Sequence, residues 1–495
     1  MKKNLLLIIL SGMLCFSCSK WLDVQPEDMI ADDEVFSNYQ GVQNAVNGIY
    51  INLVSAELYG RELTWGFSSA LARDYAHNNM VDITYNHVLV WDYEHVKVKG
   101  IAENIWAKAY TVIANCNKVL EELEKKDDSF FQYGAFERKM ITGEMKAIRG
   151  MLHLDLARLF APAPITGDDG AYMPYYKTYG SKAEPKLPTS EILKNVIADF
   201  TEAKNLLIQT DTIEKDDNYF WVGSLETLED RFNKGYSQYP FYEHRGTRMN
   251  YVAILGLLSR VHLWAGEKEQ ARTYAEEVLY EYGPTGLGYY KLNTGSQLIK
   301  GGWFNVGTSV KLSEGLLLAF YDKNLISKIN NYKTWGNNKM VLRNIRKMAT
   351  DRGDQDDARL DLIGTTTNLE PISLKWTEHE PNNFSVNWEY KLAPIIRLSE
   401  MYYILAECMW DIDPQKSRDL LNELRDYRQS RRTIVAPTYD DFIEELLWEA
   451  RKEYFTEGQT FFMFKRLNEN LIIEDEDIPM GHNFVVPVPD NENIN

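Results

Sequence analysis

Cysteine is scarce in this chain, and the few cysteines present exclude the common cysteine-based metal sites. The 495 residues contain four cysteines, at positions 15, 18, 116 and 408. Neither Cys116 nor Cys408 has a second Cys or a His at the spacing that a metal site requires. Cys116 and Cys408 each fall inside a helical pattern, far apart in sequence. Two buried thiols acting as small apolar residues are therefore favoured over a disulfide, which an oxidising compartment would permit.

Positive charge and long hydrophobic runs are also in short supply. Lys and Arg number 54 against 72 Asp and Glu, which gives a formal net charge of −18. This balance argues against nucleic acid or anionic lipid as a partner, because both need a basic face. After residue 17 no apolar stretch is both long enough and free enough of charge to cross a bilayer, since ILGLLSRVHLWAG is interrupted by Arg260 and His262.

Recognisable enzyme motifs are absent as well. The chain has no HExxH, no G-x-S-x-G and no Walker-type sequence. The acidic runs 354–361 and 474–477 lack the glycine and the spacing of a calcium loop, so we expect solvated acidic surface there. The histidines at 87, 95, 244 and 379 are too scattered to indicate a metal site. We predict no catalytic residue, no metal and no cofactor.

Residues 1–17 have the pattern of a lipoprotein signal peptide. Lys2 and Lys3 precede an apolar run at 5–10, and Ser17 places a small residue directly before Cys18. The apolar run is too short to span a bilayer. We expect Cys18 to be the lipid attachment site, which would anchor the chain to a membrane without spanning it. Cys15 stands where bacterial lipoprotein signals usually have an aliphatic residue, and an ordinary secretory signal is the alternative.

The strongest periodic segments are helical and come in pairs. Apolar residues recur every three or four positions over 102–126 and 143–160, over 250–266 and 268–283, and over 398–410 and 415–428. Another helix is expected to start at Thr189 or Ser190, with either as its cap. Recurring hairpins predict a mainly α fold of tetratricopeptide-like units that stack into an α-α superhelix. Hairpins occur in any helical protein, however, and periodicity alone leaves both interpretations open.

Residues 284–395 have a different texture. Segments such as GGWFNVG and YKTWGNNK are rich in Gly, Asn and Trp, which predicts an irregular, loop-rich region with short strands. Loops held by a rigid helical frame are where binding residues tend to lie.

Six ordered blocks resemble the signatures of the SusD/RagB family of surface lipoproteins. GEMKAIRGMLHLDLARLFAPAP, PIIRLSEMYYILAEC and EELLWEARKEYFTEGQTFFMFKRL carry most of the resemblance, and LPTSEILKNVIADFTEA, MNYVAILGLLSRVHLWAGEKEQA and FVVPVPDNE complete it. Ala161, Thr460 and Met463 depart from the family's usual Gly, Arg and Asp. The positions that match the family signatures are Glu144, Arg149, Asp155, Leu156, Phe160, Pro164, Arg397, Glu400, Glu407, Glu449, Arg451, Glu453, Glu457, Gly458, Phe462 and Arg466.

The resemblance implies an organisation and a role. After the signal peptide it implies a SusD-like N-terminal helical region at 18–210 and a C-terminal region at 211–495, loop-rich over 284–395 and helical over 398–470. It implies a non-enzymatic protein at the outer face of the outer membrane. This protein captures a nutrient, most often an oligosaccharide, and delivers it to a SusC-like TonB-dependent transporter. Peptide or glycopeptide capture is the alternative, and a surface glycan hydrolase is a third.

Sugar recognition needs flat apolar faces for the rings and polar groups for the hydroxyls. The segment 85–97 precedes the helix of Trp106, where the family often presents a binding aromatic. For any single aromatic, packing against the frame is the competing interpretation. The candidate ligand-binding residues are Trp91, Asp92 and Tyr93, with Arg73 and Asp74 as polar partners, and Trp303, Phe304, Tyr332 and Trp335 in the loop-rich region. Trp106, Trp264, Trp410 and Trp448 are assigned to core or transporter contact.

Overall fold

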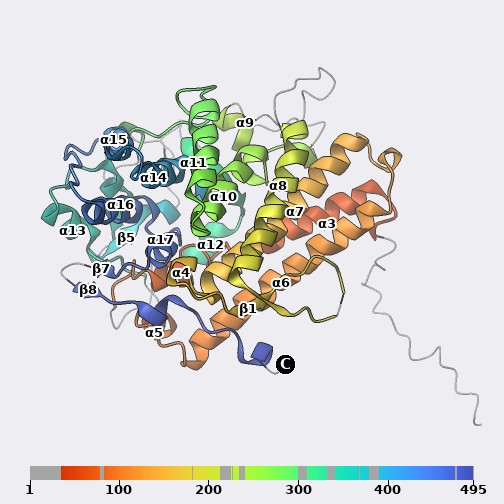
Figure 1. Cartoon of the computed structure of the whole chain (residues 1–495), viewed down its shortest axis with the longest axis horizontal. Helices are drawn as coiled ribbons and strands as arrows, with labels where there is room; N and C mark the ends of the chain where they lie inside the picture. The colour runs from red at the N-terminus through yellow and green to blue at the C-terminus, as the bar shows by residue number, and fades with distance from the viewer. Residues whose placement is uncertain are drawn as a thin grey trace, which may run out of the picture.

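The computed structural model describes residues 35–77, 83–180, 182–211, 225, 227–232, 240–298, 309–330, 332, 340–366, 368–377, 389–473 and 476–493. Within these residues the fold is mainly helical, as predicted, with short paired strands and irregular segments between the helices (Figure 1). Cys18, Trp303, Phe304 and Trp335 lie outside the described residues.

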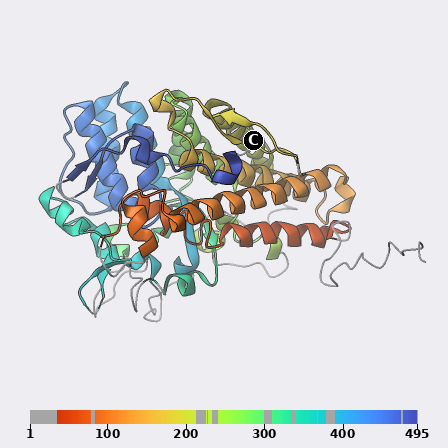
Figure 2. The same cartoon turned by 90° about the horizontal axis from the view of Figure 1, so that it is seen from below.

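Four long helices build one end of the molecule: α3 (Tyr39–Leu53), α6 (Val96–Glu124), α7 (Ala135–Phe160) and α8 (Thr189–Asp211). They lie side by side, with α7 between α6 and α8 (Figures 1 and 2). A Cβ added at Gly143 or Gly150 of α7 would lie 2.8 Å from Leu207 or 3.0 Å from Phe200 of α8. Glycine at these two positions therefore permits the close approach of the two helices.

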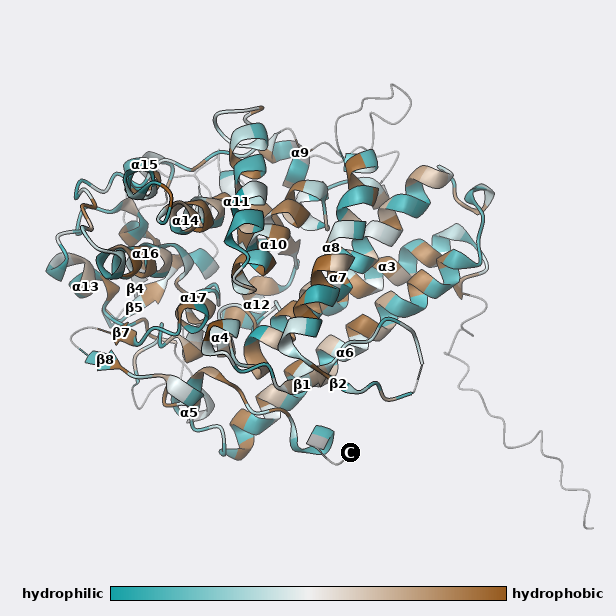
Figure 3. Cartoon of the chain, in the orientation of Figure 1, coloured by the Kyte–Doolittle hydropathy of each residue, from teal (hydrophilic) through white to brown (hydrophobic). Residues whose placement is uncertain are grey.

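The predicted hairpins continue the stack. α10 (Tyr251–Trp264) packs on α8 and pairs with α11 (Lys268–Glu277), and α11 packs on α14 (Leu398–Met409), which pairs with α15 (Pro414–Tyr427). α16 (Tyr439–Tyr454) and α17 (Thr460–Leu467) close the C-terminal end. Figure 3 shows α10 as mostly hydrophobic and α11 as mostly hydrophilic, in line with the complete burial of α10. The expected α-α arrangement of stacked hairpins is confirmed.

Side chains at the helix starts explain several boundaries. Asn250 accepts a hydrogen bond from the backbone N–H of Ala253 at the start of α10, and Thr438 forms a reciprocal capping box with Asp441 in α16. The prediction that Thr189 or Ser190 caps α8 is wrong. Asp169, from the preceding loop, accepts from both the backbone N–H and the hydroxyl of Ser190.

The strands are short and pair two by two in antiparallel fashion. β1 (Ala171–Pro174) pairs with β2 (Lys186–Pro188), and β3 (Leu316–Tyr321) pairs with β6 (Leu392–Arg397). β4 (Ile363–Thr365) pairs with β5 (Pro371–Ser373), and β7 (Leu471–Ile473) with β8 (Glu476–Ile478). The loop-rich region also carries two short helices, α12 (Leu325–Asn330) and α13 (Ile345–Asp351), and the described parts of 284–395 fit the predicted mixture of loops and short strands.

One continuous apolar core links the helical stack to the loop-rich region. Trp106, Trp264 and Trp448 are buried in it, as expected, and the half-buried Trp410 stacks on Phe442 with ring centroids 4.7 Å apart. Cys116 and Cys408 are buried and free, so the thiol interpretation is confirmed. Burial raises the pKa of both thiols.

The expectation of solvated acidic surface at 354–361 is wrong for two of its residues. Asp354 and Asp357 are wholly buried and form ion pairs with Lys452. Among the helices of the described residues, none combines the length and the apolar character needed to cross a bilayer. Within the same ranges no group of three or more His, Cys, Asp or Glu side chains is arranged to hold a metal ion.

Candidate functional site

An aromatic cluster of Trp65, Tyr85 and Tyr332 lies where the loop-rich region meets the segment before α6. The ring of Tyr332 meets Trp65 and Tyr85 in edge-on geometry, with centroids 5.2 and 6.2 Å away. Trp65 and Tyr85 are buried, whereas Tyr332 is half-buried. Arg61, also half-buried, donates from Nη1 to the hydroxyl of Tyr332 across 3.2 Å. The cluster thus presents an accessible aromatic ring and a guanidinium side by side, as sugar recognition requires.

The buried side chain of Glu62 fixes the geometry of this cluster. Its carboxylate accepts from the backbone N–H of Phe67 at 2.9 Å, from the hydroxyl of Tyr85 at 2.9 Å and from Nε of Arg61 at 2.6 Å. Burial raises the pKa of Glu62, although the charge of Arg61 opposes the shift. Because three donors from separate segments converge on one buried carboxylate, the cluster is held rigid without help from a ligand.

Arg73 and Trp91 form a second feature near α4 (Phe67–Leu71) and α5 (Ile83–Leu89). The guanidinium of Arg73 lies 4.5 Å from the ring centroid of Trp91. Each side chain also bonds to the other's segment: Nε of Arg73 donates to the carbonyl of Leu89 at 2.7 Å, and Nε1 of Trp91 to that of Leu71 at 3.1 Å. Trp91 is 9% exposed, so its ring packs into the frame and presents little surface to a ligand.

The remaining predicted residues make contacts in different places. Asp74 is buried and accepts from the backbone N–H of Thr456 at 2.9 Å, which makes it part of the frame. Asp92 lies 2.8 Å from Nδ1 of His87, and Tyr93 donates its hydroxyl to the carbonyl of Asn483 at 2.6 Å. The structure therefore brings Arg73 and Trp91 together and places Tyr332 in the aromatic cluster. The carboxylate of Asp74 does not face a ligand in either of these features.

Sequence reasoning missed Arg61, Trp65 and the role of Tyr85. Trp65 lies between two glycines in GRELTWG, a texture like that of the loop segments singled out at 301–307. This composition could have identified Trp65 as a candidate binding residue. No local signal indicated that Tyr332 would pack against it, because 267 residues separate the two.

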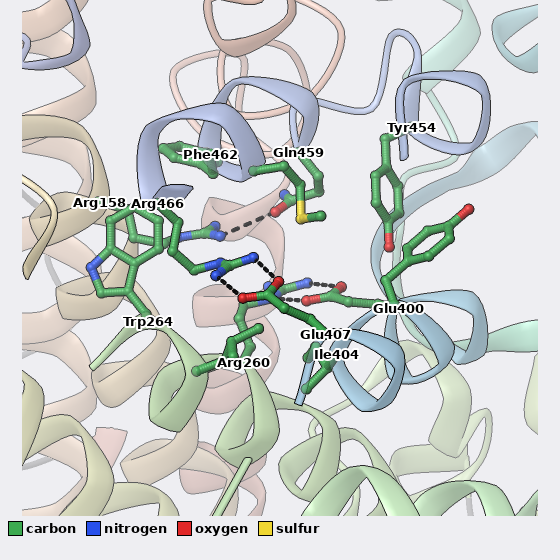
Figure 4. A pocket seen from close by; sticks show the side chains of 13 residues that line it. Arg158, Arg260, Trp264, Glu400, Ile404, Glu407, Tyr454, Gln459, Phe462 and Arg466 are labelled. Atoms are coloured by element: carbon green, nitrogen blue, oxygen red, sulfur yellow. Dashed lines mark hydrogen bonds and ion pairs between the residues drawn. The ribbon is translucent and has the colours of Figure 1, made fainter. Parts of the chain in front are cut away.

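A small cavity between α10, α14, α16 and α17 gathers residues of the family signatures (Figure 4). Arg260 pairs with Glu400 at 2.6 Å, Arg466 with Glu407 at 2.7 Å, and Arg158 donates to Gln459 at 3.2 Å. The free space is about 30 Å³, room for water and not for a sugar ring. These signature residues thus stabilise the frame, because each buried charge in the two ion pairs has an opposite charge beside it.

Comparisons with known proteins agree with this architecture. A family described as "Starch-binding associating with outer membrane" (SusD-like_3) matches residues 20–218. The chain is 24% identical to "SusD-like protein P25" of Formosa agariphila over 33% of this chain and 31% of that protein, and 23% identical to "SusD-like protein P2" of the same organism over 42% and 39%. The N-terminal part of the chain is thus similar to SusD-like proteins. These two matches span only about a third of the curated relatives' length.

Solved structures from the SusD superfamily share the fold over nearly the whole chain. A SusD superfamily protein from Bacteroides thetaiotaomicron superimposes with a TM-score of 0.68 at 19% identity, covering 92% of this chain and 97% of that one. A SusD-like carbohydrate binding protein from Bacteroides vulgatus gives 0.67 at 18% identity, covering 92% and 96%. At these identities the likeness establishes the fold alone.

Proposed function

We propose that this SusD-like protein captures a glycan at the outer surface of the outer membrane and passes it, uncleaved, to a SusC-like TonB-dependent transporter. Cys18 would carry the lipid that tethers it there. The observation that carries the proposal is the pairing of Tyr332 with Arg61 on the rigid base of Trp65 and Glu62. An aromatic face covers the C–H side of a sugar ring, and a guanidinium donates to its hydroxyls.

Rigidity of the site favours binding over turnover. Glu62 is occupied by three donors, and Asp74 is held in the frame by Thr456. A glycosidase needs two carboxyl groups free to face the scissile bond. Neither of these two carboxylates has that freedom, so the aromatic cluster is built to hold a sugar and not to cleave it.

Calorimetry with a panel of oligosaccharides and peptides tests the proposal. We expect a glycan to bind, and Tyr332→Ala to weaken it about tenfold, the effect of losing roughly 1.4 kcal/mol of contact. Tyr280→Ala is the control, because it removes an exposed tyrosine ring from the π-helical turn Val278–Tyr282 that follows α11. Binding of peptides alone would favour the alternative ligand class, and cleaved products after incubation would overturn the binding-only role.

The anchor and the partner are tested separately. Cys18→Ala should move the protein from the membrane fraction to the soluble fraction of cells, while retention in the membrane would defeat the anchor. A tagged protein purified from its own membranes should bring a TonB-dependent transporter with it. Absence of any such barrel in the purified material would count against delivery to a transporter without touching glycan capture.

A further inference from the structure

A second pair of aromatic rings reaches the surface at the start of α16. Tyr439 is 37% exposed and Trp410, at the end of α14, is half-buried, and their ring centroids lie 5.9 Å apart. The rings of Tyr439 and Trp410 both stack on Phe442, with centroids 6.5 and 4.7 Å away. Because Phe442 is fully buried in the core, it holds both rings in place without a ligand.

An exposed ion pair lies beside the ring of Tyr439. Nζ of Lys268, the first residue of α11, is 5.9 Å from the ring centroid and 2.8 Å from Oδ2 of Asp411. An ammonium has three donors and a carboxylate accepts about four hydrogen bonds, so the pair keeps further donors and acceptors for a ligand. The ring of Tyr439 and the pair therefore offer an apolar face and hydrogen-bonding groups side by side.

Arg418 of α15 has the same relationship to the other ring. Its guanidinium lies 5.7 Å from the ring centroid of Trp410 and donates to Oε1 of Gln415 at 2.9 Å. A surface aromatic ring with a guanidinium next to it is also what Tyr332 and Arg61 present in the aromatic cluster. The combination on which sugar recognition depends thus occurs twice in this protein.

A cleft of about 600 Å³ borders the turn between α10 and α11. Leu193 and Pro164 contribute to its apolar lining, and Lys194 and Glu267 to its polar lining. Glu267 and Lys268 are consecutive residues, so the turn that lines the cleft also supplies the amine beside Tyr439. Clefts of this size, with apolar walls and a few polar groups, are typical of small-ligand sites.

The new surface lies far from the aromatic cluster. A Cβ added at Gly458, shortly after the end of α16, would be 2.5 Å from the carbonyl oxygen of Leu63, two residues before Trp65. The end of α16 thus lies against the segment of the aromatic cluster, whereas Tyr439 begins the helix. The 16 residues of α16 span about 24 Å at 1.5 Å per residue. α14, α15 and α16, which carry the new surface, gather at one end of the molecule (Figure 1).

From these observations we propose that this region is a second glycan-binding surface, which takes a neutral sugar segment. One sugar ring packs on Tyr439, and its hydroxyls bond to Lys268 and Asp411, while the chain continues toward the cleft. A neutral ligand suits the surface, because Lys268 and Asp411 already balance each other. The inference rests on the proposed function and adds a second contact to it. We call Trp410, Tyr439, Lys268, Asp411, Arg418 and the cleft the Tyr439 surface.

Calorimetry with maltotriose, cellotriose and xylotriose tests the proposal. Trisaccharides are chosen because they are too short to bridge the two surfaces and report on each separately. For the trisaccharide that binds, we expect two binding events per chain in the unmodified protein. Tyr439→Ala should weaken one event about tenfold and leave the other unchanged, whereas Tyr332→Ala should do the reverse.

Further variants separate a binding role from a structural one. Tyr439→Phe keeps the ring and should bind within about threefold of the unmodified protein, because the stacking face is retained. Tyr280→Ala is the control: Tyr280 is 46% exposed and follows the opposite end of α11 from Lys268, so both binding events should persist. Thermal melting checks each fold. If Tyr439→Ala does not fold, Lys268→Gln and Lys194→Met, at exposed side chains, should each weaken the same event several-fold.

The outcomes distinguish this proposal from the proposed function. A single binding event that is weakened by Tyr332→Ala and untouched by Tyr439→Ala would overturn the second surface and leave glycan capture intact. Failure of every glycan, short or long, to bind would overturn the proposed function itself. Unchanged glycan binding in Tyr439→Ala, together with loss of a co-purifying transporter, would make the Tyr439 surface a protein contact and would also overturn the second glycan site.

Discussion

Nζ of Lys452 lies 2.7 Å from Oδ2 of Asp354, and neither side chain reaches solvent. The pair belongs to a larger buried network that ties the loop-rich region to α15 and α16. Its acids are Asp354, Asp357, Glu449 and Glu453, and its bases are Arg359, Arg425, Arg428 and Lys452. Equal numbers of buried opposite charges leave none uncompensated, which is the condition under which such networks are tolerated.

Removal of one acid from this network should be costly. Asp354→Asn leaves Arg425 and Lys452 without a full partner, and we expect a loss of about 3–5 kcal/mol at pH 7. Asp351→Asn is the matched control, since Asp351 forms an exposed pair with Lys347, and such a pair is worth at most about 1 kcal/mol. Urea denaturation of both variants makes the comparison. Similar midpoints for the two would contradict the structural role of Asp354.

The pH dependence of this contribution has a definite sign. Burial alone would raise the pKa of Asp354, but the hydrogen bonds from Arg425 and the charge of Lys452 outweigh it and hold the pKa below its usual range. A depressed pKa stabilises the fold above the unfolded value near 4 and loses that contribution as the pH falls through the acid range. The stability gap between the unmodified protein and Asp354→Asn should therefore narrow toward pH 3.

The helices were predictable and the acid run was not, for a physical reason. Apolar periodicity predicts the boundaries of α10 and α14 to within a residue or two, because the buried face of a helix depends on the spacing of apolar residues nearby in sequence. Asp354 looks like surface in sequence because its partners Arg425 and Lys452 lie more than 70 residues away. Asp357 pairs with Arg359 two residues on, but it also pairs with the distant Lys452. Whether a charge is solvated or paired depends on contacts that local sequence does not record.

Lys465 is the inverse case, a buried base for which the described residues supply no acidic partner. Its Nζ donates to the carbonyl of Leu159 at 3.1 Å, and burial together with the charge of Arg158 lowers the pKa of Lys465 well below the usual value. Lys465→Met keeps the stem and removes the amine, and the carbonyl of Leu159 still accepts from the backbone N–H of Val486. We expect Lys465→Met to stabilise the protein by about 1 kcal/mol or more at pH 7.

The control for Lys465→Met is Lys323→Met, which alters an exposed lysine and should be close to neutral. A lowered lysine pKa costs stability below the unfolded value near 10.4, so the advantage of Lys465→Met should shrink as the pH approaches 10. Thermal midpoints at pH 7 and 9.5 measure both effects. Destabilisation by Lys465→Met at pH 7 would show that the amine contributes packing or bonding beyond the contact to Leu159.

Substitutions at Trp91 and Tyr332 should have different effects, the first mainly on stability and the second mainly on ligand binding. Trp91 packs under Arg73 and is nearly buried, so Trp91→Ala should cost about 3–5 kcal/mol of stability, as for other buried aromatics. Trp91→Phe keeps most of the packing and should retain most of the stability. If Trp91 contacts the ligand directly, Trp91→Phe will weaken binding as much as Tyr332→Ala; if it only supports Arg73, binding by Trp91→Phe will stay within about threefold of the unmodified protein.

The candidate site was predictable in kind but not in its membership. Aromatic and polar residues in Gly- and Asn-rich segments indicated the right parts of the chain, and Tyr332 does lie in the aromatic cluster. Which aromatics face outward depends on tertiary packing: Trp91 is covered by Arg73, while Trp65 supports Tyr332 from the core. Asp74 illustrates the same limit, because its polar partner is the backbone of Thr456 far along the chain.

His153 gives the last test, which concerns acid sensitivity. It is buried in α7 and stacked on Tyr175 at 3.8 Å. Nδ1 lies 2.9 Å from the carbonyl of Arg149, and Nε2 accepts from the backbone N–H of Tyr176 at 3.2 Å. Both ring nitrogens are thus engaged in the neutral form, and burial lowers the pKa of His153 to about 3.

Because the unfolded chain takes up a proton near pH 6.5 and the folded His153 does not, stability is lost as the pH falls through that value. Between pH 7.5 and 5.5 the loss from this residue should be about 1.4 kcal/mol. Gln can replace both hydrogen bonds of His153 but does not titrate, so the free energy of unfolding of His153→Gln should fall less steeply between pH 7.5 and 5.5 than that of the unmodified protein. His482→Gln, at an exposed position, should follow the unmodified protein. Parallel stability curves for the unmodified protein and His153→Gln would mean that the buried imidazole is protonated in the folded state, and the tautomer inferred from its two contacts would be wrong.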